Sequence, residues 1–277
     1  MSFAETHEAM HREELCGVPT VRRVAAMLDL DAVDFSAGAP LPRGWQFVML
    51  GADTRRSALR RDGFPGLGVP MPDLGLPRLM LGGRSVSFAG DIPIGAPVTR
   101  SSAVRSVVHK TNESGPMAIV TLVHELRIAE QAAPALVETQ TYLLLSAGKP
   151  RADEPLKPAD PVTAAHVRTV TPDDTLLFQY SALGFNSHRI HIDRDYARNE
   201  EGFPDLVVNG GLTTLLLSEF LRRDLNLVPA AFKVRHMAPL FCNRPVTLAA
   251  DRIGARWRLR AFDDHNRLAA EMEVDIQ

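Results

Sequence analysis

Residues Asn186–Leu225 read NSHRIHIDRDYARNEEGFPDLVVNGGLTTLLLSEFLRRDL. The stretch sets two histidines and an amide in a short polar segment. A Gly-Gly step follows, and then a helix-forming run with leucine and phenylalanine on nearly every side. A helix that is apolar all round lies inside a protein rather than on its surface. We therefore expect a buried helix over Leu212–Leu225, around which the rest of the chain is organised.

The residues before this helix, Asn209, Gly210 and Gly211, carry no large side chain. The free N–H groups of the first turn, together with the positive end of the helix dipole, form a site for a carbonyl oxygen that gains negative charge. The alternative is structural, and these three residues alone favour it: Asn209 is an N-cap and the glycines permit close packing.

The polar segment upstream contains Asn186, His188 and His191, and Asp193 is the expected N-cap of a short helix after it. A lone histidine in a loop is usually a surface or packing residue. Two imidazoles beside an amide, a few residues before a backbone donor site, leave a catalytic role equally open.

Composition limits the classes of protein. The chain has 277 residues, 45% hydrophobic and 23% charged, which is typical of globular proteins and leaves room for two domains. A net charge of -2 argues against a nucleic-acid partner. Cys16 and Cys242 match no zinc or disulfide spacing. No secretory signal and no apolar run of ~18 residues is present, so we expect a cytoplasmic protein with no membrane, metal or cofactor requirement.

The order of expected elements favours an α+β fold with antiparallel sheets. A helix over Pro19–Leu30 precedes a Gly- and Pro-rich stretch, Ser36–Pro77, which is long enough to line a site or to be mobile. Strands are expected over Ser85–Ala89, Pro97–His109, Met117–Ile128 and Leu136–Leu145. The Pro-rich segment 148–161 is a linker, so we divide the chain into domains 1–147 and 162–277.

The second half repeats this plan. A helix over Asp173–Leu183 and the buried helix are followed by expected strands over Phe232–Met237, Pro245–Ala250, Ala255–Phe262 and Leu268–Ile276. The tripeptide PVT occurs at Pro97 and again at Pro245, at the same stage of each half, which indicates a duplicated domain. Superposing the two tripeptides sets Asn186–His191 against Gly38–Arg43, which has no histidine. We infer that one copy kept the chemistry and the other became a scaffold and part of a binding wall.

The segments NSHRIHIDRDYA and FPDLVVNGGL resemble the MaoC-like (R)-specific hydratase/dehydratase family. The similarity is to its two-domain branch, with the type 2 thioester dehydratases and the mesaconyl-CoA and itaconyl-CoA hydratases. PRLMLGGRSVSFAGDIPIG and ESGPMAIVTLVHELR are similar to the first domain of that branch. The resemblance implies a tandem hot-dog fold, with two antiparallel sheets each wrapped round a central helix. The first domain would be the degenerate one and the second catalytic.

Family members have an Asp, a His five positions later and an Asp two beyond, with a His-Gly step downstream. His191 and Asp193 match this pattern, whereas Asn186 replaces the first Asp, and the step reads Asn209-Gly210. The resemblance implies water addition to the double bond of an enoyl thioester. His191 would be the general base, Asn186 would hold the water, and the N–H groups of Gly210 and Gly211 would bind the thioester oxygen. An amide at Asn209 cannot transfer a proton.

The other binding residues are assigned by charge. His188 either orients His191 or faces solvent. Arg189 and Arg198 could bind the free carboxylate of a branched C5 dicarboxylic monothioester, mesaconyl-C4-CoA or itaconyl-CoA, hydrated to citramalyl-CoA; either could instead pair with a nearby acid. The candidates for the coenzyme A phosphates, which could equally form a solvated face, are Arg252, Arg256, Arg258 and Arg260. The expected partner is a CoA thioester, bound by a homo-oligomer.

Two other functions fit the same residues. Many hot-dog thioesterases have a Gly-Gly step and an acidic residue further along the central helix, a position that Glu219 could fill. A non-catalytic acyl-thioester binding module is the third interpretation, because the site has lost two ionisable groups relative to the commoner pattern.

Overall fold

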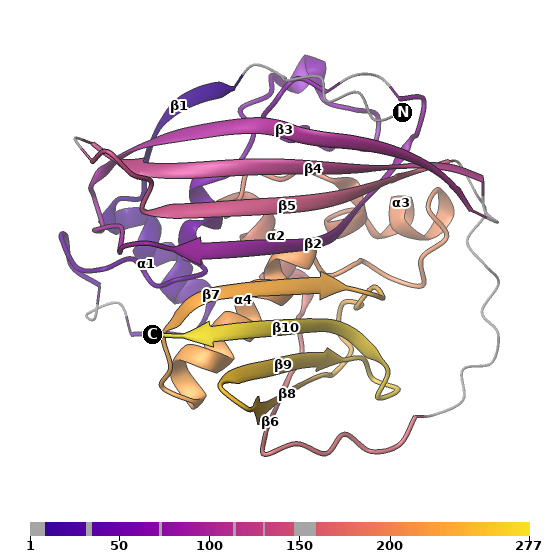
Figure 1. Cartoon of the computed structure of the whole chain (residues 1–277). Coiled ribbons are helices and arrows are strands. Elements are labelled where there is room, and N and C mark those ends of the chain that lie inside the picture. The colour runs from indigo at the N-terminus through magenta and orange to yellow at the C-terminus, as the bar shows by residue number, and fades with distance from the viewer. Residues whose placement is uncertain (1–8, 32–34, 72–73, 113–114, 130, 147–158) are drawn as a thin grey trace.

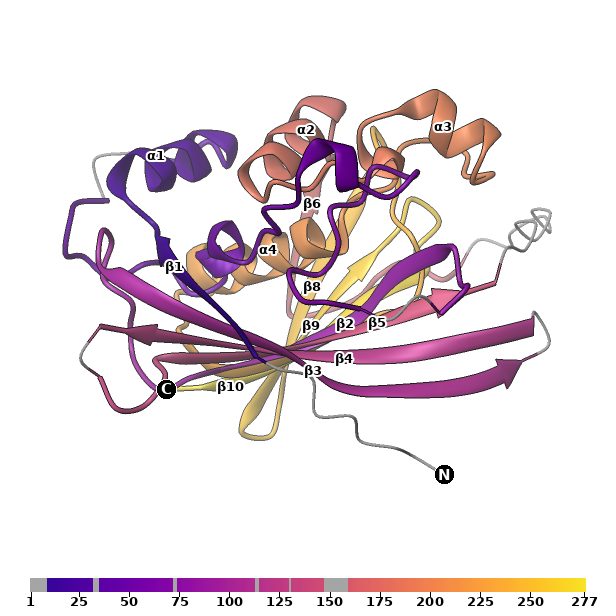
Figure 2. The same cartoon turned by 90° about the horizontal axis from the view of Figure 1, so that it is seen from above.

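The computed structural model describes residues 9–31, 35–71, 74–112, 115–129, 131–146 and 159–277. Its strands form one antiparallel sheet of ten, in the order β1-β3-β4-β5-β2-β7-β10-β9-β8-β6 (Figure 1). The helices all lie on one face of this sheet (Figure 2). A sheet that is covered on one side buries every second residue of a strand, and the strand β4 (Gly115–Ile128) does so from Ala118 to Leu126.

The first half of the chain contributes five strands to the sheet, and its one α-helix among the described residues is α1 (Val18–Met27). Four strands overlap the predicted ones, and β1 is an edge strand that the polar sequence MHREEL did not reveal. The strands are β1 (Met10–Leu15), β2 (Arg78–Phe88), β3 (Pro97–Asn112), β4 and β5 (Leu136–Leu145). Two short 3₁₀ helices, η2 (Trp45–Met49) and η3 (Arg56–Ala58), lie in the Gly- and Pro-rich stretch.

The second half repeats the order of the first. Its strands are β6 (His166–Val170), β7 (Pro229–His236), β8 (Val246–Ile253), β9 (Arg256–Phe262) and β10 (Leu268–Ile276). Its helices are α2 (Asp174–Leu183), η4 (Arg189–His191), α3 (Arg194–Asn199), α4 (Gly210–Glu219) and the π-helical turn η5 (Phe220–Asp224). The two PVT tripeptides begin or adjoin β3 and β8, which occupy the same place in the two halves. The duplication and the double hot-dog fold are thus confirmed.

The halves join edge to edge, because β2 pairs with β7 in an antiparallel ladder from Gly83↔Arg235 to Ser87↔Ala231. The two expected sheets therefore form one. Gly83 allows this join: a Cβ at that position would lie 2.5 Å from the carbonyl oxygen of Val234. Pairing the two inner edges leaves no open strand edge in the middle of the molecule.

The predicted buried helix is present as α4 continued by η5, with Leu212, Leu215, Leu217 and Phe220 almost wholly buried. It lies against the helix face of the sheet (Figure 2). Burying each of these side chains stabilises the fold by about 1.5–3 kcal/mol. This burial explains why the run is apolar on all sides.

The alignment of the two halves through their site segments was wrong. The isolated bridge Pro40↔Pro93 in the first half has its counterpart in Val207↔Phe241, so GAPLPR lies where the second half has Asp205 to Gly210 and not where it has its histidines. Arg43 therefore stands at the position of Gly210. The five-residue η2 is what the first half has in place of α4, so the expectation of a central helix in each half is also wrong.

The first half is built around α4 instead of a long helix of its own. Trp45 of η2 is fully buried, and its Nε1 donates a hydrogen bond of 2.8 Å to Glu219 of α4. Residues 148–158 of the expected linker lie outside the described residues, and the division into domains 1–147 and 162–277 stays a prediction. No helix among the described residues is long and apolar enough to cross a membrane.

Candidate active site

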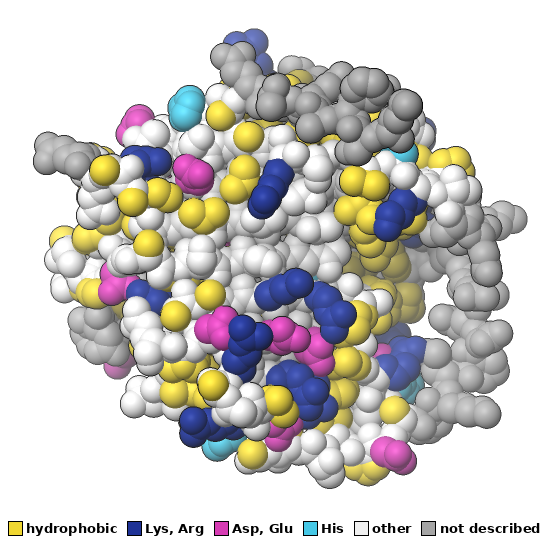
Figure 3. All heavy atoms as spheres, viewed as in Figure 1, with side chains coloured by type: hydrophobic (Ala, Val, Ile, Leu, Met, Phe, Trp, Pro, Cys, Tyr) yellow, Lys and Arg dark blue, Asp and Glu magenta, His cyan; other side chains and the backbone are white. Residues whose placement is uncertain are grey.

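A cavity of about 250 Å³ lies where the start of α4 meets the join between the two halves. Its wall comes from the second half, through the histidine segment, the start of α4 and the end of β7, and from the first half, through β2, β5 and Phe64. Met80 and Met237 line it and are 36% and 49% exposed, so the mouth lies between the beginning of β2 and the end of β7. A recess with hydrophobic side chains is visible on that side of the molecule (Figure 3).

The floor of the cavity is the first turn of α4. Gly210 and Gly211 both line it, and the N–H groups of a helix's first turn have no partner within the helix. A Cβ on Gly211 would overlap the hydroxyl of Tyr180, and one on Gly210 would lie 3.4 Å from Nε2 of His236. The two glycines therefore leave room for polar side chains around exposed backbone donors.

His191 stands in the wall of the same cavity and is 8% exposed. Its Nδ1 lies 2.7 Å from the carbonyl oxygen of Val207. A carbonyl only accepts hydrogen bonds, so Nδ1 carries the proton and Nε2 keeps a lone pair. Burial, and to a lesser degree the neighbouring His188, lowers the pKa of His191 to about 3. The ring is a neutral base at physiological pH.

Asn186 and His188 line the cavity beside it. The side-chain oxygen of Asn186 accepts a hydrogen bond of 3.1 Å from the backbone N–H of His188, which fixes the turn between them. The ring of His188 is edge-on to that of His191, with centroids 5.4 Å apart. Burial and the charge of Arg60 lower the pKa of His188 to about 4, so it is neutral as well. His188 is 6% exposed and does not face solvent.

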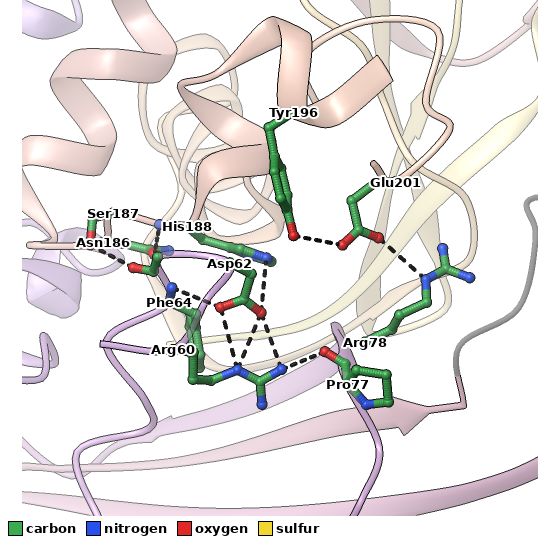
Figure 4. A network of polar contacts seen from close by, with 11 residues as sticks. Arg60, Asp62, Phe64, Pro77, Arg78, Asn186, Ser187, His188, Tyr196 and Glu201 are labelled. Carbon is green, nitrogen blue, oxygen red and sulfur yellow. Dashed lines mark hydrogen bonds and ion pairs between the residues drawn. The ribbon is translucent and has the colours of Figure 1, made fainter. Parts of the chain in front are cut away.

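The Gly- and Pro-rich stretch of the first half closes over these residues (Figure 4). The backbone N–H of Arg189 donates to the carbonyl of Asp62 at 2.9 Å, and the hydroxyl of Ser187 donates to the carbonyl of Gly63 at 2.6 Å. Gly63 has φ +76, and a Cβ there would lie 2.5 Å from the carbonyl oxygen of Ser187. The sequence left two roles open for this stretch, to line a site or to be mobile, and the structure shows that it lines the site. It places Phe64 against His188.

Asn209 is the N-cap of α4 but makes no side-chain capping bond. Its amide nitrogen lies 3.3 Å from the hydroxyl of Ser181, and its Oδ1 is buried with no protein partner. Because Asn209 lines the cavity, this oxygen is available to a ligand.

Arg189 and Arg198 are not among the residues that line the cavity. Arg189 pairs with Asp193 at 2.8 Å and lies over the ring of Tyr196. Arg198 pairs with Asp205 at 3.2 Å. The structure brings neither of these predicted substrate-binding arginines to the cavity, and both have the acidic partners that were the other possibility.

The four arginines proposed for the coenzyme A phosphates are also absent from the cavity wall. Arg256 and Arg260 pair with Asp275 and Asp251. Basic and acidic side chains gather over the strands of the second half on the outer face of the sheet (Figure 3). Arg256 is 63% exposed and fits the solvated face that was the alternative interpretation, whereas Arg260 is only 19% exposed.

Sequence reasoning missed five polar residues of the cavity. They are Arg84 of β2, Tyr142 of β5, Tyr180 of α2, Thr213 of α4 and His236 of β7. Nε2 of His236 is buried without a partner, and burial lowers the pKa of this imidazole to about 3. His236 could have drawn attention as a histidine at the end of a predicted strand. Nothing in the local pattern marks Arg84 or Tyr180.

Glu219, the candidate acid of the thioesterase interpretation, does not line the cavity. It lies at the other end of α4, where it accepts hydrogen bonds from Trp45 and from Arg222 at 2.6 Å. The structure therefore removes the carboxylate on which that interpretation rested.

The family model of hydroxyacyl-thioester dehydratase type 2 matches residues 44–242. Mesaconyl-C(4)-CoA hydratase of Chloroflexus aurantiacus is 36% identical over 253 residues, 91% of this chain and 89% of that protein.

Solved structures show the same fold. A MaoC-like dehydratase of Phytophthora capsici superposes with a TM-score of 0.70 at 13% identity, covering 98% of this chain and 96% of the other. A Mycobacterium tuberculosis protein described as having a double hotdog fold superposes with a TM-score of 0.61 at 14% identity, covering 98% and 96%. The chain therefore belongs to the hydroxyacyl-thioester dehydratase type 2 family, as its resemblance to MaoC-like proteins predicted, and it is a hydro-lyase.

Proposed function

We propose that the protein is an acyl-CoA hydratase whose substrate is a branched C5 dicarboxylic monothioester of the mesaconyl-C4-CoA type, hydrated to citramalyl-CoA. The relative from Chloroflexus aurantiacus supports this substrate class. The proposed chemistry is supported mainly by the neutral His191, whose Nε2 keeps a lone pair. His191 lines the same cavity as Gly210 and Gly211, which form its floor.

In the proposed reaction, Nε2 of His191 takes a proton from water while the water oxygen bonds to the β-carbon. The electrons of the double bond then move to the thioester, whose oxygen becomes an enolate held by the N–H groups of Gly210 and Gly211. The protonated His191 returns its proton to the α-carbon, and the carbonyl forms again. The reverse order gives dehydration.

Asn186 and Asn209 have supporting parts in this scheme. The Asn186 oxygen already accepts from His188, so its amide NH₂ is the group that would hold the attacking water. The unpartnered Oδ1 of Asn209 could accept a hydrogen bond from the same water or from the product hydroxyl. Neither amide transfers a proton, which leaves His191 as the proton carrier.

The position of the double bond favours mesaconyl-C4-CoA over itaconyl-CoA. In the first, the double bond is conjugated with the thioester carbonyl, so addition of water produces the enolate that the α4 amides would stabilise. In the second, it is one carbon further away, and no such enolate forms directly. A cavity of about 250 Å³ is near the lower end of the ~300–1,000 Å³ of small-molecule clefts, which suits a short acyl group.

The test compares three thioesters: mesaconyl-C4-CoA, crotonyl-CoA and the saturated butyryl-CoA. Loss of the enoyl absorbance without thiol release is the expected result for the first. Thiol release would indicate a thioesterase, and no change with any of the three thioesters would leave the binding module as the remaining interpretation.

His191→Gln should lower kcat by about 10²–10⁴-fold, since it removes the proton carrier. His109→Gln, at an exposed position on β3, is the control and should have no effect.

The homo-oligomer and the cytoplasmic location stay predictions. Light scattering on the purified protein measures the first.

A further inference from the structure

Arg84 is an arginine from the first half of the chain that reaches the cavity of the second half. It lies opposite Val234 in the β2–β7 ladder, and its side chain is 9% exposed. Among the described residues that line the cavity it is the only arginine or lysine. The three imidazoles of the wall, His188, His191 and His236, all have a lowered pKa and are neutral. The positive charge of the cavity therefore belongs to Arg84.

Arg84 is held from behind. Its Nη1 lies 3.0 Å from Oε1 of Glu138, a fully buried carboxylate that also accepts from Gln140 at 2.7 Å and from Gln46 at 3.0 Å. Burial alone would lower the pKa of Arg84, but the charge of Glu138 raises it, so the guanidinium stays protonated. This scaffold fixes the direction in which the rest of the guanidinium points.

The other edge of the guanidinium, formed by Nε and Nη2, has no hydrogen-bond acceptor among the residues that the structure describes. Nε is buried without a hydrogen-bond partner, and Nη2 lies 3.4 Å from where a Cβ on Gly211 would be, beside the floor of the cavity. An unsatisfied donor on a buried charged group has a cost in folding free energy. An apolar acyl chain would leave that cost in place. A carboxylate would remove it, because its two oxygens match the two donors of one guanidinium edge.

We propose that Arg84 binds the free carboxylate of a dicarboxylic monothioester, and so determines that the enzyme selects a charged acyl group. This inference rests on the proposed hydratase function and replaces the sequence-based assignment of Arg189 and Arg198. Arg84 is thus a specificity-determining residue that the first half supplies to the active site of the second.

The test uses a pair of substrates that differ at one group. Mesaconyl-C4-CoA carries a carboxylate where 3-methylcrotonyl-CoA carries a methyl, on the same carbon of the same conjugated enoyl thioester. Arg84→Gln should lower the ratio of kcat/KM for mesaconyl-C4-CoA to kcat/KM for 3-methylcrotonyl-CoA by on the order of 100-fold, which is the contribution of a hydrogen-bonded charge pair. The loss should fall on the dicarboxylic substrate alone. Arg235→Gln is the matched control, an exposed arginine on the other face of β7 that pairs with Glu271, and should leave the ratio unchanged.

Removing Arg84 alone strands Glu138, and the variant can fail to fold for that reason. The double variant Arg84→Gln/Glu138→Gln removes both charges and keeps hydrogen-bonding groups at both positions, and the same loss of ratio is expected. An equal fall with both substrates would overturn the proposal, since it would mean that Arg84 stabilises the fold or the enolate. A wild-type enzyme with no preference for the carboxylate would overturn it too.

Binding separates this proposal from the hydratase function. Succinyl-CoA and butyryl-CoA have the same chain length and no double bond, and they differ by a terminal carboxylate against a methyl. Calorimetry should show tighter binding of succinyl-CoA to the wild type, and equal binding of the two to Arg84→Gln/Glu138→Gln. If no enoyl thioester is hydrated, the proposed function fails, and the binding ratio still decides the role of Arg84.

Discussion

At the scale of single residues, the proposed chemistry depends on one hydrogen bond. The carbonyl of Val207 fixes the tautomer of His191, and burial keeps the ring neutral. A motif in the sequence identifies the histidine but says nothing about which nitrogen carries the proton. The local backbone decides that, because Val207 lies just before α4 and presents its carbonyl to the ring.

The pH dependence of hydration follows from this burial. The pKa of His191 is lowered to about 3, so the unprotonated base is fully present above the ordinary histidine value of about 6.5 and is lost only as the pH falls towards the lowered value. We expect kcat/KM for mesaconyl-C4-CoA to change less than about twofold between pH 8 and pH 6. Stopped-flow absorbance measures the profile, and circular dichroism at each pH checks the fold. An acid limb centred near pH 6.5 would contradict the prediction.

At the scale of elements, the start of α4 is shaped by its two glycines for different reasons. Gly210 has the end of the flexible Leu81 side chain as its nearest neighbour, at 3.1 Å, whereas Gly211 faces the hydroxyl of Tyr180, a buried residue of α2. Tyr180 is also stacked on Phe47, with ring centroids 4.6 Å apart, and has little freedom to move. The Gly-Gly step is therefore a packing requirement as well as a source of free amides.

Gly211→Ala should destabilise the protein by roughly 1–3 kcal/mol through this overlap. Gly210→Ala is the matched control and should cost less, because the Leu81 side chain can shift. In a Tyr180→Phe background the nearest atom to the new methyl is the ring carbon at 3.1 Å, so most of the loss from Gly211→Ala should disappear. Denaturant unfolding of the four variants measures this cycle. Equal costs in both backgrounds would show that the hydroxyl is not the obstacle.

At the scale of the whole molecule, the active site belongs to neither half alone. The β2–β7 ladder brings Arg84 to the cavity, and the Gly- and Pro-rich stretch brings Phe64. Arg43 stands where the second half has Gly210 and η2 stands where it has α4, so we infer that the first half keeps no equivalent site. The duplicated copy thus serves as one wall of the remaining site.

Expressing residues 1–147 and 159–277 separately tests this arrangement. We expect the second piece alone to be inactive and prone to association, because β7 becomes an open edge strand. Mixing the pieces should restore hydration of mesaconyl-C4-CoA as the ladder forms again. Enzyme assay and light scattering of each piece and of the mixture are the measurements. Near-full activity of 159–277 alone would show that the first half is dispensable.

The sequence by itself determined the elements and the residues of local motifs. Periodicity located the buried helix and eight of the ten strands, and the family resemblance placed His191, Asn186 and the glycines in one site. The periodicity of the sequence did not reveal the short polar edge strands β1 and β6, because they have little apolar alternation. The buried helix and the eight strands were predictable because burial of one face of an element leaves a repeat in the local sequence.

The tertiary structure alone decided which cation lines the cavity. Arg189 is four residues from Asp193 along the chain and pairs with it, whereas Arg84 meets Gly211 only because two strands from different halves lie side by side. Tyr180, His236 and Phe64 reach the cavity in the same way. Contacts between residues far apart in sequence leave no local period, so only the folded chain reveals them.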